Sequence, residues 1–168
     1  FLTINILAHN RKIIPFKNKI DQMMECKPDA LIMADPGLIA IVKERYPDVD
    51  IHLSVQANTM NWETVKFWHK NGVSRVILSR ELSIDEIKEI KDNVPEMELE
   101  AFVHGAICIA HSGRCLLSNF FTHRDANQGV CTNACRWPYK LYSKPDYENE
   151  DLNQQLDLHA DFYLEEKE

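Results

Sequence analysis

The sequence predicts an α/β protein in which parallel strands alternate with helices and a cysteine-rich segment follows the sheet. Five apolar, β-rich runs recur about every 24 residues, and each of the first four is followed by a helical pattern. Regular strand–helix units of this kind form parallel sheets with right-handed crossovers. The short spacing and the absence of a glycine-rich phosphate turn favour part of a TIM-like (β/α) barrel, although a doubly wound sheet also fits the alternation.

The expected strands are short and almost continuously apolar, as is typical when both faces of a parallel sheet are covered. They are residues 3–8, 30–33, 51–55, 75–78 and 99–103. Five strands cannot close an eight-stranded barrel. Because the chain also opens without Met and within a strand pattern, we expect it to be a fragment of a longer protein.

Four helices are expected between the strands, and three of them carry recognisable end signals. Pro36 suits the first turn of the second helix, and Gly72 is a frequent type of stop after the third. Ser83 and Glu86 form a capping-box pattern in front of the fourth helix, which Pro95 ends. The helical segments are residues 13–24, 36–46, 61–71 and the one that begins after Ser83.

Polar side chains follow each expected strand, at the edge of the sheet that holds the active site in barrel enzymes. Short turns are also polar because they satisfy backbone groups and helix caps, so this pattern alone has two interpretations. The residues are His9, Asn10, Asp35, Gln56, Asn58, Arg80, Glu81 and His104. We take Arg80, Glu81 and His104 as candidate catalytic residues.

The charge is distributed unevenly along the chain. The 168 residues carry a net charge of −7, but residues 101–144 alone carry five basic side chains against one acidic, for +4. A basic segment is compatible with an RNA backbone, and a solvated face is the simpler alternative. Arg114, Arg124 and Arg136 are the candidate RNA-binding residues.

We expect a barrel fragment at 1–104, a cysteine-rich segment at 105–144, and an acidic linker with the start of a further element at 145–168.

Four of the five cysteines, Cys108, Cys115, Cys131 and Cys135, lie within 28 residues. An odd number of cysteines without a secretory segment indicates reduced thiols in the cytoplasm, and no apolar run is long enough to span a membrane. Four thiolates suit zinc or an iron–sulfur cluster, and the absence of a C-x-x-C knuckle favours the cluster. Small buried thiols are the alternative. Cys26, on a helical segment away from this group, is expected to be a packed, reduced thiol.

The cysteine segment also resembles a known family. The stretch Glu100-Ala-Phe-Val-His-Gly-Ala-Ile-Cys108, followed by Gly113-Arg-Cys-Leu-Leu-Ser118, is similar to the signature of the collagenase-like peptidases of unknown catalytic type, family thirty-two. Residues 29–38, 52–58, 75–82 and 127–137 look like the branch that forms 5-hydroxyuridine in tRNA. The resemblance covers about residues 3–142.

The resemblance implies an iron–sulfur enzyme that hydroxylates the wobble uridine of tRNA without molecular oxygen. It implies a 4Fe–4S cluster on Cys108, Cys115, Cys131 and Cys135, a small-molecule hydroxyl donor such as prephenate, and in some members a partner protein. It further implies a barrel that starts about two βα units before Phe1 and a C-terminal part beyond Glu168.

Two other functions stay open at this point. A peptidase, as the family is named, would need a nucleophile such as Cys108 or Cys115 with His104 or His111 as its base. The sequence has neither an H-E-x-x-H nor a G-x-S-x-G motif. A non-catalytic scaffold stabilised by zinc or by a cluster is the second alternative.

Overall fold

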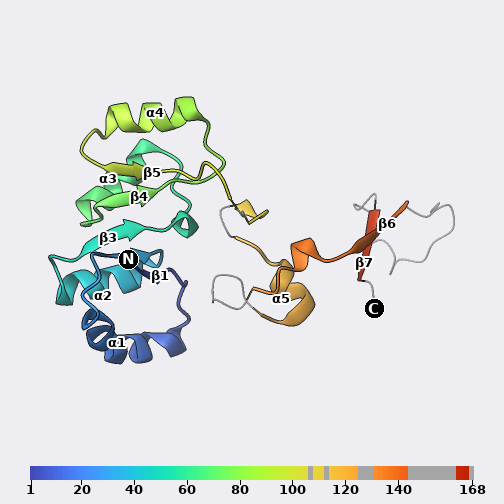
Figure 1. Ribbon diagram of the computed structural model, residues 1–168, viewed down its shortest axis with the longest axis horizontal. Coiled ribbons are helices and arrows are strands. Elements are labelled where there is room, and N and C mark those ends of the chain that lie inside the picture. The colour runs from blue at the N-terminus through green and yellow to red at the C-terminus, as the bar shows by residue number, and fades with distance from the viewer. Residues whose placement is uncertain (106–107, 112–113, 125–130, 144–161, 167–168) are drawn as a thin grey trace. The chain divides into compact units, whose positions relative to one another are not determined.

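The structure is a computed structural model that describes residues 1–105, 108–111, 114–124, 131–143 and 162–166 (Figure 1). These residues fall into two compact units, Phe1–Thr132 and Asn133–Glu168. The first unit holds a parallel sheet with its helices, and the second holds a pair of antiparallel strands. None of the described helices is long and apolar enough to cross a membrane.

The sheet of the first unit has five parallel strands in the order of the sequence. They are β1 (Leu2–Ile4), β2 (Ala30–Met33), β3 (Asp50–Leu53), β4 (Arg75–Ile77) and β5 (Glu98–Glu100). Each crossover therefore moves one strand further in the same direction, whereas a doubly wound sheet reverses its order at a switch point. The predicted α/β class with a parallel sheet is confirmed, and closure into a barrel stays a prediction.

Helices occupy the four crossovers, as the sequence predicts. They are α1 (Asn10–Met24), α2 (Pro36–Arg45), α3 (Trp62–Lys70) and α4 (Ile84–Asn93). The capping box is present, because Ser83 Oγ accepts from the Glu86 amide while Glu86 Oε2 accepts from the Ser83 amide. Gly72 follows α3 at φ +79°, a conformation that favours glycine. The 3₁₀ turn η1 (Val55–Ala57) and the short helix α5 (Leu117–Thr122) also belong to the first unit.

One face of the sheet packs against these helices and forms the core. Alternate residues of the strands supply it, among them Leu31, Met33 and Leu53, all fully buried. The helices add side chains such as Leu38 and Val65, which are also fully buried. Apolar burial of this kind is the main stabilising contribution to the unit.

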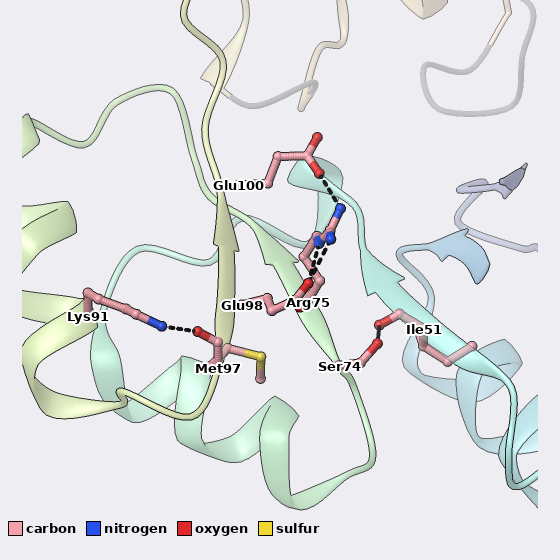
Figure 2. A network of polar contacts seen from close by, with 7 residues as sticks. All are labelled: Ile51, Ser74, Arg75, Lys91, Met97, Glu98 and Glu100. Atoms are coloured by element: carbon pink, nitrogen blue, oxygen red, sulfur yellow. Dashed lines mark hydrogen bonds and ion pairs between the residues drawn. The ribbon is translucent and has the colours of Figure 1, made fainter. Parts of the chain in front are cut away.

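The opposite face of the sheet is polar near the amino ends of the strands. The register aligns His52 with Arg75 and Arg75 with Glu98, so these residues share a face. Arg75 forms ion pairs with Glu98, at 2.7 Å, and with Glu100, at 3.5 Å. Figure 2 shows both pairs. His52 is buried, with the Phe1 ring edge-on at 4.7 Å, and this burial together with nearby Arg75 lowers the pKa of the imidazole.

The loops that follow α2 and α4 repeat one another. Lys43 Nζ donates to the carbonyls of Pro47 and Val49 at 3.1 and 2.7 Å. Lys91 Nζ does the same four and six residues on, to Pro95 and Met97 at 2.8 Å each. Figure 2 shows the contact between Lys91 and Met97. Each lysine thereby satisfies carbonyls of the turn that ends its helix.

Two strand predictions are wrong at their ends. The first strand was expected to run through residue 8, but β1 stops at Ile4, where its neighbour β2 stops at Met33. The fifth was expected at 99–103, but β5 ends at Glu100, paired with Ile77 through the last residue pair of the ladder. Beyond it, Phe102 and Val103 are 56% and 96% exposed. A strand continues only as far as a neighbour offers hydrogen bonds, which an apolar run does not reveal.

The second unit contains the short turn η3 (Ala134–Arg136) and the antiparallel pair β6 (Tyr139–Ser143) and β7 (Phe162–Glu166). The expected linker at 145–160 lies outside the described residues.

Candidate functional site

The polar residues at the carboxyl edge of the sheet have different partners. Asp35 serves the fold: its Oδ1 accepts from the amides of Gly37 and Leu38 at 2.9 and 3.0 Å, which caps α2. Its Oδ2 accepts from the Ala8 amide at 3.0 Å, which holds the loop after β1. The carboxylate is thus engaged by three backbone donors, so Asp35 has the cap role that polar turn residues commonly have.

Asn58, after β3, instead reaches the cysteine segment. It ends η1 in a left-handed conformation, φ +53° and ψ +49°, which asparagine tolerates better than most residues. Its Nδ2 lies 3.2 Å from His111 Nδ1 and 3.4 Å from the His111 carbonyl, and its Oδ1 accepts from Arg114 Nε. Because Arg114 can only donate, it orients the carboxamide so that Nδ2 donates and the His111 ring accepts.

Arg80, in the loop after β4, also contacts the cysteine segment. Its side chain is half-buried, and Nη2 donates to the Ala110 carbonyl at 3.4 Å. The other two candidate catalytic residues, Glu81 and His104, are exposed. The structure therefore brings Arg80 to the chain between Cys108 and Cys115.

Three buried polar atoms lie on the same two loops. Gln56 Oε1, Thr59 Oγ1 and Ser79 Oγ have no hydrogen-bond partner among the described residues. The Ser79 amide donates to the Thr59 carbonyl at 3.2 Å, which joins the loops after β3 and β4. Buried polar groups normally have a hydrogen-bond partner, so these three atoms are exceptions among the described residues.

None of the five cysteines forms a disulfide bond in the structure. Cys115 is half-buried, and its sulfur accepts the Leu117 amide at 3.3 Å. Cys108, Cys131 and Cys135 are exposed. Among the described residues, no three His, Cys, Asp or Glu side chains gather in an arrangement that could hold a metal ion. Cys26 is also exposed, just beyond α1, so its predicted packing is wrong: it lies past the last helical turn rather than on the buried face.

A hydroxyl pair connects the two cysteine stretches within the first unit. Ser118 on α5 is 2% exposed, and its Oγ lies 3.2 Å from Thr132 Oγ1 and accepts the Thr132 amide at 3.4 Å. Thr132 follows Cys131 directly, so this contact ties the residue beside Cys131 to the helix that begins two residues after Cys115. This pairing has no signal in the sequence, since serine and threonine are common in any turn.

The remaining candidate residues lie at the surface. Arg114 is exposed apart from its contact with Asn58, and Arg124 is exposed beyond α5. Cys135 and Arg136 lie in η3 of the second unit and are exposed.

The donor set suits a thiolate-bound metal better than a set of packed thiols. Four cysteines without a disulfide, three of them exposed, do not behave as small core residues. Backbone amides that donate to cysteine sulfurs tune iron–sulfur sites, and the Leu117 amide donates to Cys115 Sγ in this way. We conclude that these residues fit such a group chemically.

The chain is therefore an α/β protein in which loops at the carboxyl edge of a parallel sheet contact a cysteine-rich segment. The sequence profile of Peptidase family U32 matches residues 1–168, and the chain belongs to that family. No solved structure matches it.

Curated relatives carry RNA-related names. The chain is 61% identical over 141 residues to the tRNA hydroxylation protein P of Haemophilus influenzae, and 58% identical over 141 residues to that of Escherichia coli. Each of these alignments covers 84% of this chain and 31% of the relative. It is 36% identical over 141 residues, 84% of this chain and 21% of the relative, to the 23S rRNA 5-hydroxycytidine C2501 synthase of E. coli. The chain therefore spans about a third or less of the length of these relatives.

Proposed function

We propose that the protein containing this chain is an RNA hydroxylase that converts the wobble uridine of tRNA to 5-hydroxyuridine. The observation that carries the proposal is the 61% identity to a protein named for tRNA hydroxylation. A relative named as an rRNA 5-hydroxycytidine synthase supports the same reaction type on a second pyrimidine. The five strands would be consecutive strands of a barrel completed by the rest of the protein.

We further propose that Cys108, Cys115, Cys131 and Cys135 hold a 4Fe–4S cluster. The hydroxyl pair of Ser118 and Thr132 supports it, because it ties the second cysteine stretch to the first. When bound, such a cluster supplies electron transfer or an open iron that activates an oxygen donor. Zinc on the same thiolates is the alternative that metal analysis separates.

The side chains at this edge would orient the RNA and the hydroxyl donor. Arg124 and Arg136 are exposed cations that suit phosphate contacts, whereas Arg114 already donates through Nε to Asn58. Replacing a C–H hydrogen by a hydroxyl group is a two-electron oxidation, so the molecule that gives up the hydroxyl group must also take up the two electrons as its own bond to oxygen breaks, while the displaced hydrogen leaves as a proton. Prephenate is the donor we propose to test, and a partner protein is a further candidate.

The geometry favours this function over a peptidase. In a Cys–His–Asn site, the side-chain oxygen of the asparagine accepts a hydrogen bond from one ring N–H of the histidine, which leaves the other ring nitrogen to act as the base. Here Asn58 presents Nδ2 to His111, which makes the ring an acceptor. Within the described part of the chain, neither His104 nor His111 forms a hydrogen bond to Cys108 or Cys115. The acid–base pair that a cysteine peptidase needs is therefore not assembled from these residues.

The test combines a deletion strain with single cysteine variants of the full-length protein. Nucleoside analysis of tRNA should show loss of 5-hydroxyuridine derivatives on deletion, return with the wild-type gene, and no return with Cys131→Ser. Cys26→Ser is the matched control, because Cys26 lies outside the four-cysteine group, and it should restore the modification fully. Unchanged 5-hydroxyuridine in the deletion strain would show that the proposed substrate is wrong. Protein purified anaerobically should contain iron and sulfide, and stoichiometric zinc instead would overturn the cluster.

A further inference from the structure

We infer that Asn58 is a positioning residue that, together with Arg80, fixes the chain between Cys108 and Cys115 against the carboxyl edge of the sheet. The inference rests on the proposed function in one respect: the two sulfurs so placed are the first two proposed cluster ligands. The contacts themselves are independent of any metal.

Two separate loops converge on the same short stretch. Asn58, from the loop after β3, contacts His111 and Arg114, which lie 53 and 56 residues further along the chain. Arg80, from the loop after β4, donates to the Ala110 carbonyl at 3.4 Å. Six residues separate Cys108 from Cys115, and three of them are held by these two side chains. Holding both ring and backbone of His111 restricts how the two cysteines can be oriented.

Asn58 is itself held in place before it makes these contacts. Its amide donates to the Val55 carbonyl at 3.0 Å, and Ser54 Oγ accepts the Gln56 amide at 3.3 Å, so the turn closes on itself. The next residue, Thr59, is fully buried and bonded through its carbonyl to Ser79. The side chain of Asn58 therefore projects from a fixed turn, and its contacts need little further ordering.

The carboxamide is suited to this role because it donates and accepts at once. Nδ2 donates toward His111 while Oδ1 accepts from Arg114. Aspartate keeps the acceptor for Arg114 and loses the donor for His111, and alanine loses both. This difference gives a graded series at one position.

The experiment measures alkylation of individual cysteines by iodoacetamide in the full-length protein, after iron is removed with a chelator under reducing, anaerobic conditions. Mass spectrometry gives the rates at Cys108 and Cys115, and exposed Cys26 serves as the internal reference. Asn58→Ala should raise the rate at half-buried Cys115 relative to Cys26 by about fivefold or more, since two to three hydrogen bonds are lost. Asn58→Asp should fall between alanine and wild type.

Asn61→Ala is the matched control. Asn61 Oδ1 accepts the Thr64 amide at 2.9 Å and caps α3, so the same substitution lowers stability without touching the cysteine stretch. Its Cys115-to-Cys26 ratio should equal that of wild type. A rise in this control as large as in Asn58→Ala would attribute the effect to general destabilisation and overturn the inference.

A second measurement separates this inference from the proposed function. After anaerobic reconstitution, wild type and Asn58→Ala are compared in iron content and in the electron paramagnetic resonance spectrum of the reduced protein. A displaced ligand stretch should shift the spectrum, which Asn61→Ala should leave unchanged. If wild type takes up no iron, the proposed cluster is wrong, and the alkylation series still decides the role of Asn58. If wild type loads iron and Asn58→Ala matches it in alkylation and spectrum, the positioning role is wrong and the cluster stands.

Discussion

Asp35 offers a sharp test of whether a polar residue at the carboxyl edge serves the fold or the chemistry. Its carboxylate accepts three backbone amides, two at the start of α2 and one from Ala8. Asp35→Ala removes both acceptor oxygens and with them all three hydrogen bonds. Asp35→Asn keeps Oδ1 as the cap and places an NH₂ group opposite the Ala8 amide, where two donors then face each other.

The expected magnitudes follow from these contacts. Loss of an N-cap costs about 0.5–2 kcal/mol, and an amide left without its acceptor costs about 1–3 kcal/mol, nearer the lower value for half-buried Ala8. Asp35→Ala should therefore lower the free energy of unfolding by about 2–3 kcal/mol. Asp35→Asn should lower it by about 1–2 kcal/mol, because the cap survives while the Ala8 contact and the favourable charge at the helix start are lost.

Urea unfolding of the full-length protein, followed by tryptophan fluorescence, measures both variants, since Trp68 is 8% exposed in the core of the sheet unit. The midpoint should move with an unchanged m-value. The reasoning is refuted if Asp35→Ala is within about 0.5 kcal/mol of wild type, which is the range of neutral surface changes. It is equally refuted if Asp35→Asn folds as stably as wild type but no longer supports tRNA hydroxylation, because the carboxylate would then act in the chemistry.

Three further predictions use the same unfolding assay. Ser83→Ala should cost about 1 kcal/mol by opening the capping box, and an unchanged midpoint would contradict the cap. Burial and Arg75 lower the pKa of His52, so the unfolded chain binds this proton more readily and stability should decline as pH falls below about 6.5. His52→Gln should lack that part of the decline. Identical pH profiles for this variant and the wild type would show that His52 does not contribute to it. Thr59→Val should stabilise the protein by up to about 1 kcal/mol, because the buried hydroxyl has no partner among the described residues; a loss of stability would show that the hydroxyl has a partner elsewhere.

The elements of the sheet unit were predictable because their signals are local. Pro36, Gly72 and the Ser83–Glu86 box act within one helical turn of the ends that they mark, and the structure has helix ends at those places. The repeated loop with Lys43 and Lys91 also had a signal, a lysine four residues before proline in both copies. Comparing the two βα units with each other would have found it.

The site was predictable in its residue types and not in its contacts. The spacing of the cysteines singles out the segment, but the pairing of Ser118 with Thr132 and of Asn58 with Arg114 joins residues 14 and 56 positions apart. Such contacts depend on how distant parts of the chain come together, and periodicity within a window carries no information on that. The ends of β1 and β5 were misjudged for the same reason, since a partner strand sets them.

The row of polar residues after the strands was open to two interpretations, and the structure gives members of the row different kinds of partner. Asp35 directs its oxygens back to the amides of its own edge, so its polarity is explained by the fold. Asn58 and Arg80 satisfy no helix cap with their side chains and reach instead to residues between two cysteines. These two side chains contact a distant segment and not the backbone of their own loops. The fold of those loops therefore does not explain why the residues are polar. That difference in partner, rather than residue type or position after a strand, distinguishes the side chains at this edge that belong with the cysteine segment.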